Sequence, residues 1–143
     1  MNEIKRILVP TDGSDCSIRA AELAIHLAKV FNAELFVIYV IDTVILDEIA
    51  KGAEKEVIER ELREKGRRYL NYIMKMAERE GLTATPILVK GEPHDQIVQH
   101  AKVQAVNLIV MGTYGRRGTE RILIGSVAER VIEYAPCPVL VVR

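Results

Sequence analysis

The chain has 143 residues and no net charge, because twenty basic residues balance twenty acidic ones. Its 49% hydrophobic and 28% charged residues are typical of a globular domain, which excludes a disordered or fibrous chain. A neutral chain lacks the overall field that attracts nucleic acid or an anionic membrane, and no apolar run reaches the ~20 residues that cross a bilayer. We therefore expect a single domain over residues 1–143, located in the cytoplasm, without nucleic-acid or membrane partners.

The hydrophobic pattern alternates along the chain between two periods. Short aliphatic runs predict buried strands, and apolar residues at three- and four-residue steps predict amphipathic helices. In chain order the pattern predicts a strand at 4–9, a helix at about 14–31, a strand at 35–41, a long helix ending near Gly81, a strand at 83–89, a helix from 93 to about 104, a strand at 107–111, a helix at about 126–134 and a strand at 138–142. Residues 42–53 have no clear period, so no element is predicted there.

Strands that alternate with helices and are aliphatic throughout predict a parallel sheet covered on both faces. Right-handed crossovers make this a three-layer, doubly wound α/β fold with five strands. Pro86 within the third strand predicts either an edge position for this strand or a lost hydrogen bond in the sheet. In such folds ligands bind beyond the carboxyl ends of the strands, where the winding reverses. If the loops PTDGSD and GTYGRRG form one site there, the first and fourth strands are neighbours and the order is 3-2-1-4-5.

The stretch GTYGRRGTERILIGS, residues 112–126, is the strongest candidate for a ligand site. Glycines allow a backbone to approach an anion closely, and the helix predicted after Gly125 offers unpaired N–H groups and a partial positive charge. Arg116 and Arg117 either add charge to such a site or lie on a solvated surface. The stretch does not match the Walker pattern, the dinucleotide pattern GxGxxG or the hydrolase pattern GxSxG. What it contains is Gly112-x2-Gly115-x9-Gly125-Ser126.

With this spacing the chain resembles the universal stress protein family, in particular its ATP-binding subgroup, whose pattern is G-x2-G-x9-G-[S/T]. The resemblance extends to the opening ILVPTDGS, the turn GEPHDQI and the ending CPVLVVR. It implies the adenine nucleotide alpha hydrolase-like fold, ATP bound without a Walker loop, and dimers. It does not imply one well-defined reaction.

The resemblance also implies which residues contact the nucleotide. It places Pro10, Thr11 and Asp12 at the ribose and adenine, Val40 at the adenine, and Gly112, Gly115, Gly125, Ser126 and the backbone of Val127 at the phosphates. Arg116 falls within this pattern, which prescribes no side chain there. The chemistry of Asp12 fits the ribose, whose hydroxyls can donate to a carboxylate that phosphates would repel. The alternative role for Asp12 is helix capping.

Several alternatives concern the ligand and the chemistry. AMP or ADP is an alternative to ATP, and Mg²⁺ or Mn²⁺ is expected to be held mainly by the phosphates. Ser126 begins an S-x-x-E capping box, so its hydroxyl serves its own helix, a phosphate or both. No set of nucleophile, base and orienting group is evident, so no catalytic residue is predicted. Slow ATP hydrolysis or self-phosphorylation at Thr119 or Ser126, and a nucleotide-free structural role, remain competing hypotheses.

Cysteines, histidines and the last strand complete the expectations. Cys16 and Cys137 lack redox or zinc spacing and are interpreted as small apolar residues. No metal site is predicted from the histidines, because His94 and His100, six residues apart, lie on different faces of a helix. The apolar strand at 138–142 would leave a bare edge, which predicts that a homodimer forms through this strand. Other protein partners are not identifiable from the sequence.

Overall fold

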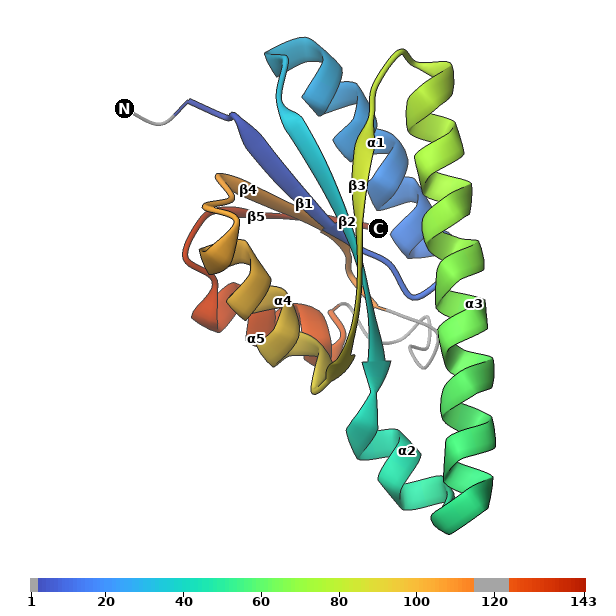
Figure 1. The fold of residues 1–143 in the computed structure, drawn as a ribbon. Helices are drawn as coiled ribbons and strands as arrows, with labels where there is room; N and C mark the ends of the chain where they lie inside the picture. The colour runs from blue at the N-terminus through green and yellow to red at the C-terminus, as the bar shows by residue number, and fades with distance from the viewer. Residues whose placement is uncertain (1–2, 115–123) are drawn as a thin grey trace.

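The computed structural model describes residues 3–114 and 124–143. Its elements follow one another around a single sheet, as Figure 1 shows. In chain order they are β1 (Arg6–Pro10), α1 (Asp15–Phe31), β2 (Glu34–Asp42), α2 (Thr43–Ile49), α3 (Gly52–Arg79), β3 (Ala84–Gly91), α4 (Pro93–Val103), β4 (Leu108–Gly112), α5 (Ser126–Tyr134) and β5 (Val139–Val142). None of the helices in the described ranges combines the length and the apolar character needed to cross a bilayer.

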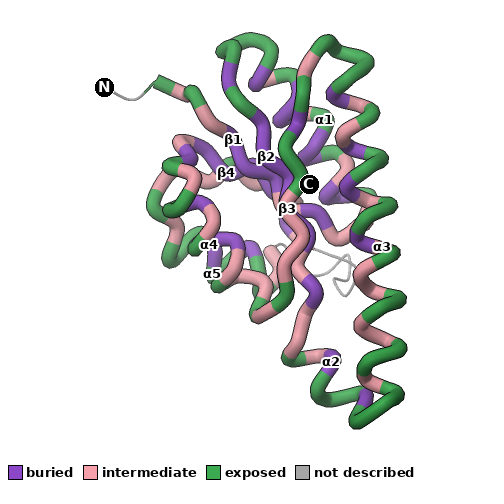
Figure 2. Tube along the Cα trace, viewed as in Figure 1, coloured by how far each residue is buried: buried purple, intermediate pink, exposed green. Residues whose placement is uncertain are grey.

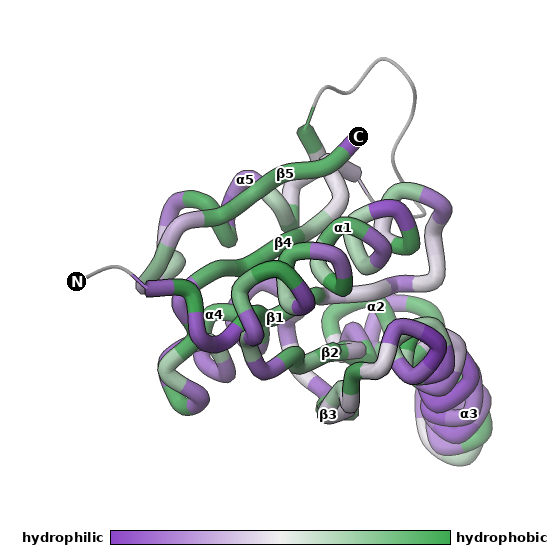
Figure 3. The backbone as a smooth tube through the Cα atoms, turned by 90° about the horizontal axis from the view of Figure 1, so that it is seen from above, coloured by the Kyte–Doolittle hydropathy of each residue, from purple (hydrophilic) through white to green (hydrophobic). Residues whose placement is uncertain are grey.

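The five strands are parallel and lie in the order β3-β2-β1-β4-β5, which confirms the predicted topology. Figure 3 shows the sheet from its end, with α1 and α3 on one side and α4 and α5 on the other. Right-handed crossovers explain this division, because the chain winds outward through β2 and β3 and then crosses back to β4 and β5. The winding therefore reverses between β1 and β4.

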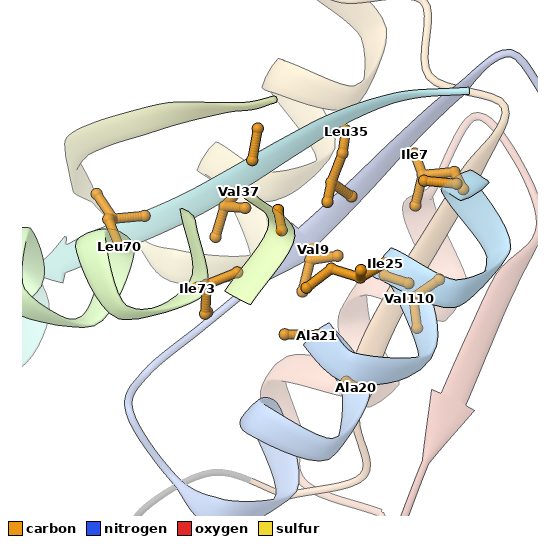
Figure 4. Packing of buried hydrophobic residues seen from close by; sticks show 14 of the residues in the cluster. Ile7, Val9, Ala20, Ala21, Ile25, Leu35, Val37, Leu70, Ile73 and Val110 are labelled. Carbon is orange, nitrogen blue, oxygen red and sulfur yellow. The ribbon is translucent and has the colours of Figure 1, made fainter. Parts of the chain in front are cut away.

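The core consists of two layers, one on each face of the sheet. Successive strand residues point to opposite faces, so Ile7 and Val9 pack beneath α1 and α3 while Leu8 packs against α4 and α5. Figure 4 shows the first layer, where Leu70 and Ile73 of α3 approach β2. Figure 2 shows the buried residues gathered on the central strands, whereas the end of α3 that adjoins α2 is mostly exposed.

The edge position of β3 confirms the prediction made from Pro86. Two hydrogen bonds, from Glu34 N–H to Lys5 O at 2.8 Å and from Thr11 N–H to Ile38 O at 2.9 Å, show that even-numbered residues of β2 direct their backbone groups toward β1. Odd-numbered residues of β2 therefore face β3, and Pro86, the register partner of Val37, faces away from β2. The missing N–H of this proline costs no bond within the sheet.

The region 42–53, where no element was predicted, contains the short helix α2 and the start of α3. Asp42 caps α2, since its Oδ1 accepts hydrogen bonds from Val44 N–H at 3.1 Å and Ile45 N–H at 3.2 Å. Only Leu46 of this helix is buried, which explains why seven residues showed no periodic pattern. The capping aspartate was the available signal.

Candidate functional site

The two loops singled out in the sequence meet at the carboxyl edge of the sheet. Strands β1 and β4 are neighbours, with Ile7 opposite Leu108 and Leu8 opposite Ile109, and both chains leave the sheet at this edge. The conditional inference that these strands are adjacent is therefore confirmed. This edge, where the winding reverses, is where open α/β folds bind ligands.

The loop after β1 is held by its own side chains. Thr11 is buried, and its Oγ1 accepts from Gly13 N–H at 3.2 Å and lies 3.2 Å from Ser17 Oγ. Asp12 Oδ1 accepts from Ser14 N–H at 2.9 Å, which forms a tight turn before α1. The residue that caps α1 is Ser14, whose hydroxyl accepts from Ser17 N–H at 3.2 Å. Helix capping by Asp12, the alternative considered from the sequence, is therefore wrong, because Ser14 occupies that position.

Gly112 lies at the end of β4 in close contact with the start of α1. A Cβ on this residue would lie 2.9 Å from Cys16 Sγ and 3.1 Å from its carbonyl carbon, so a side chain here would displace Cys16 and press on the backbone of α1. Thr113, the next residue, is buried; its N–H donates to Val142 O at 2.8 Å and its Oγ1 lies 3.5 Å from Cys16 Sγ. The backbone at Gly112 and Thr113 is thereby fixed between α1 and β5.

Gly125 closes the second loop onto this backbone. Its N–H donates a hydrogen bond to Thr113 O, and a Cβ here would lie 3.1 Å from Tyr114 Cα and 3.2 Å from Thr113 O. Only a glycine permits this approach without displacing the chain. The two ends of the glycine stretch, Gly112–Tyr114 and Gly125, are consequently side by side, as the ligand-site hypothesis requires.

Helix α5 begins at this point with backbone donors that have no partner among residues 3–114 and 124–143. Gly125 is its N-cap residue and forms no side-chain cap, and the first helical bond runs from Glu129 N–H to Gly125 O at 3.0 Å. The N–H groups of Ser126, Val127 and Ala128 thus have no partner within the helix. The predicted capping box is wrong, because Ser126 is the first helical residue and not the cap. Its exposed side chain leaves the helix end open to an anion.

Val40 supplies a different kind of group at the same edge. Since Ile38 directs its backbone toward β1, Val40, two residues further, directs its N–H and C=O to the same side. The pairing of β1 with β2 ends at Pro10 and Ile38, so β1 has already left the sheet at the level of Val40. A hydrogen-bond donor and an acceptor therefore face the open side of a strand, next to the loop of Asp12.

Cys16, which the sequence suggested was only a small apolar residue, takes part in this network. It is a free cysteine whose Sγ donates to Val142 O at 3.0 Å. Burial raises the pKa of the Cys16 thiol, but hydrogen bonds from Thr113 and from the backbone of Tyr114, together with the charge of Arg19, outweigh it and hold the pKa below its usual value. Cys137 is also free, and burial raises its pKa.

The structure brings most of the predicted site residues to one edge of the sheet. Those described there are Pro10, Thr11, Asp12, Val40, Gly112, Gly125, Ser126 and Val127. Gly115, Arg116, Arg117 and Thr119 lie outside the described residues. The linking roles of Thr113 and Cys16 were not predicted from the sequence, because their contacts with Val142 join residues about thirty and more than a hundred positions apart. The available signals were the position of Thr113 directly after Gly112 and the position of Cys16 at the start of α1.

Comparison with known proteins identifies the class. The model of the universal stress protein family matches residues 3–143, so the chain belongs to this family. The universal stress protein MJ0531 of Methanocaldococcus jannaschii is 46% identical over 142 residues, which cover 99% of this chain and 84% of that protein.

Solved structures agree with this assignment. The structure of MJ0577 from M. jannaschii superimposes with a TM-score of 0.87 at 31% identity, covering 98% of this chain and 96% of that one. A universal stress protein solved in complex with cAMP superimposes with a TM-score of 0.76 at 26% identity, covering 99% of this chain and 98% of that one.

Proposed function

We propose that this universal stress protein binds ATP at the carboxyl edge of the sheet and acts as a nucleotide-dependent regulatory protein. The observation that carries the proposal is the meeting of the uncapped start of α5, the close-packed backbone at Gly112 and the open edge of Val40. The related structure in complex with cAMP supports an adenine nucleotide as the ligand class.

The adenine ring is assigned to Val40. Adenine presents an acceptor, N1, beside a donor, the N6 amino group, and a strand edge that offers N–H and C=O side by side can pair with both. A guanine would place a donor opposite the N–H of Val40, so the same edge would disfavour it. Pro10 at the end of β1 and Val40 on β2 both point to the face that α4 and α5 cover, and they supply apolar contact for the ring.

The phosphates are assigned to the start of α5 and to the glycine backbone. Three N–H groups without a helical partner and the helix dipole favour an anion there, and the exposed Ser126 hydroxyl adds a donor. Mg²⁺ or Mn²⁺ would then be held mainly by the phosphate oxygens and water. Asp12, half-buried in the turn before α1, is assigned to the ribose hydroxyls, while the Thr11 hydroxyl is engaged with Gly13 and leaves its backbone for contact.

Isothermal titration of the purified protein with ATP and magnesium tests the proposal. We expect saturable heat at one site per chain, and weaker binding of GTP because the Val40 edge pairs with adenine. Heat release of any co-purified nucleotide, followed by mass analysis, distinguishes ATP from ADP and AMP. Absence of both binding heat and thermal stabilisation at millimolar ATP would refute nucleotide binding.

We also propose that the chain forms a homodimer through β5. This strand is the other edge of the sheet, and Leu140 on it is exposed. Because Ile109 N–H donates to Pro138 O at 3.0 Å, even-numbered residues of β5 face β4, so Val139 and Val141 direct their backbone groups outward. An antiparallel copy of β5 would satisfy those groups and cover the apolar strand. Sedimentation at micromolar concentration measures this state, and a monomer would contradict it.

A further inference from the structure

A groove between α3 and the edge strand β3 lies on the side of the molecule away from β5. Its volume is about 470 Å³. Apolar side chains line it from both elements: Leu70 and Met74 from α3, and Pro86 and Leu88 from β3. In Figure 3, β3 forms the end of the row of strands, with α3 alongside it. The nucleotide site proposed above uses none of these residues.

The middle part of α3, residues 60–75, lies beside this groove and is basic although the whole chain is neutral. Residues 60–75 contain six basic and two acidic residues, a net charge of +4, against zero for the chain. The charged residues that line the groove itself are Arg67, Arg68 and Glu64. Arg67 is ion-paired with Glu64, whereas Arg68 forms no ion pair within residues 3–114 and 124–143. The rim of the groove therefore attracts a negatively charged ligand.

The backbone of β3 offers hydrogen-bonding groups along the same groove. The register places Leu88 opposite Tyr39 and Lys90 opposite Ile41, two residues of β2 that face β3. Leu88 and Lys90 must then direct their own N–H and C=O groups away from β2, toward the free edge. Pro86 presents only its C=O on this edge. An extended chain laid beside β3 could thus pair with two successive outward-facing residues next to an apolar groove.

We propose that the groove binds an extended acidic segment of a partner protein, added as a strand beside β3. Main-chain bonds to Leu88 and Lys90 would provide affinity. On the face of the added strand that is turned toward α3, apolar side chains would enter the groove and carboxylates would lie near Arg67 and Arg68. A second copy of this chain does not fit, because pairing two β3 edges would bring together two copies of residues 60–75, each with a net charge of +4, and these would repel one another. Nucleic acid fits less well, since the residues that line the groove include no aromatic ring on which bases stack.

The first test uses a defined probe on the full chain. The probe is an acetylated, amidated eight-residue peptide with threonine at every second position and valine and glutamate in turn at the others, so that the valines and glutamates share one face of the extended strand. It carries a fluorophore for anisotropy, and the matched peptide has lysine in place of glutamate. We expect the glutamate peptide to bind at least about tenfold more tightly than the lysine peptide, and an excess of ATP to leave this binding unchanged. Equal binding of both peptides, or no binding of the glutamate peptide at 1 mM, would overturn the proposal.

Variants locate the binding on the molecule. Arg68→Glu should weaken binding of the glutamate peptide about fivefold or more. Lys102→Glu, an exposed charge reversal on α4, should change this affinity by less than about twofold. Lys90→Pro removes an outward N–H without removing a bond to β2, and should abolish most of the binding. Lys90→Ala is its control, because it removes the same Lys90–Glu59 ion pair but keeps the N–H. Thermal unfolding of each variant verifies that it is folded.

Other occupants are distinguished in the same series. Tighter binding of a twelve-nucleotide single-stranded DNA than of the glutamate peptide would replace the proposal with nucleic-acid binding. A change in the sedimentation of Lys90→Pro without peptide would identify the groove as a contact between copies of the chain. Equal loss of binding in Lys90→Ala and Lys90→Pro would overturn strand addition.

Discussion

The ring of Tyr69, on α3, occupies the space into which a Cβ on Gly13 would point. Gly13 lies in the loop after β1 with φ +82°, a left-handed conformation that favours glycine. Tyr69 is more than fifty residues away in sequence and also lies against Tyr39 of β2, with ring centroids 6.0 Å apart. Helix α3 thus packs against the loop that carries Asp12, and the shape of this loop depends on both Gly13 and Tyr69.

We expect Gly13→Ala to lower the free energy of unfolding by about 2–4 kcal/mol, from left-handed strain of ~1 kcal/mol and overpacking of ~1–3 kcal/mol. In a Tyr69→Ala background the ring is absent, so the same change should cost only the strain, about 1 kcal/mol. Urea unfolding of the four proteins measures this difference. Equal costs in both backgrounds would show that the ring does not restrict the loop.

Ser126 allows charge at the start of α5 to be tested apart from folding. Ser126→Glu places a carboxylate on the first helical residue, which the dipole favours by about 0.3–1 kcal/mol, so stability should hold or rise. The same carboxylate would repel the phosphates, and ATP affinity should fall at least about tenfold. Ser126→Gln introduces a side chain of similar size to glutamate but without charge, so it should lower ATP affinity much less. Calorimetry and thermal unfolding provide the two readouts, and undiminished ATP binding by Ser126→Glu would exclude α5 as the phosphate site.

Two proline variants test the proposed dimer. Val141→Pro removes an N–H that faces the free edge of β5, so the subunit should stay folded, within about 1 kcal/mol, while the dimer dissociates. Leu140→Pro removes an N–H directed at β4, so it should destabilise the subunit itself by about 1–3 kcal/mol. Sedimentation and urea unfolding separate the effects. A Val141→Pro protein that remains dimeric would place the interface elsewhere.

The two cysteines should have opposite effects on the free energy of unfolding as the pH becomes alkaline. The folded state lowers the pKa of Cys16 below 9.0, so as pH rises toward that value the unfolded chain holds more protons and the free energy of unfolding increases. Burial raises the pKa of Cys137 above 9.0, so its contribution is present below that value and is lost as pH rises through the folded pKa.

Urea unfolding between pH 7 and 10 of the wild type, Cys16→Ala and Cys137→Ala measures both effects. The stability advantage of the wild type over Cys16→Ala should grow with pH, and its advantage over Cys137→Ala should shrink. Parallel pH curves for all three proteins would show that neither thiol titrates differently in the folded state.

Part of the candidate site could be predicted because some of its residues are recognisable from their spacing in the sequence. Gly112, Gly125 and Ser126 stand out by spacing, and the structure brings the first two to one backbone segment, at Thr113. The capping box failed because the same four letters fit a helix that begins one residue earlier, with Gly125 as its cap. The S-x-x-E pattern permits a capping hydrogen bond, but the path of the backbone into the helix decides whether that hydrogen bond forms.

The sequence by itself determined the class of fold, because aliphatic strands that alternate with amphipathic helices form a parallel sheet covered on both faces. It predicted the strand order only on the condition that the two loops form one site, and the edge position of β3 as one of two interpretations of Pro86. Only the tertiary structure decided which backbone groups are left unpaired. The open N–H and C=O of Val40 and the outward ones of Leu88, Lys90, Val139 and Val141 depend on register and on where a neighbouring strand ends. Tyr69 behind Gly13 and Cys16 beneath Gly112 are likewise contacts between distant segments, which local periodicity does not encode.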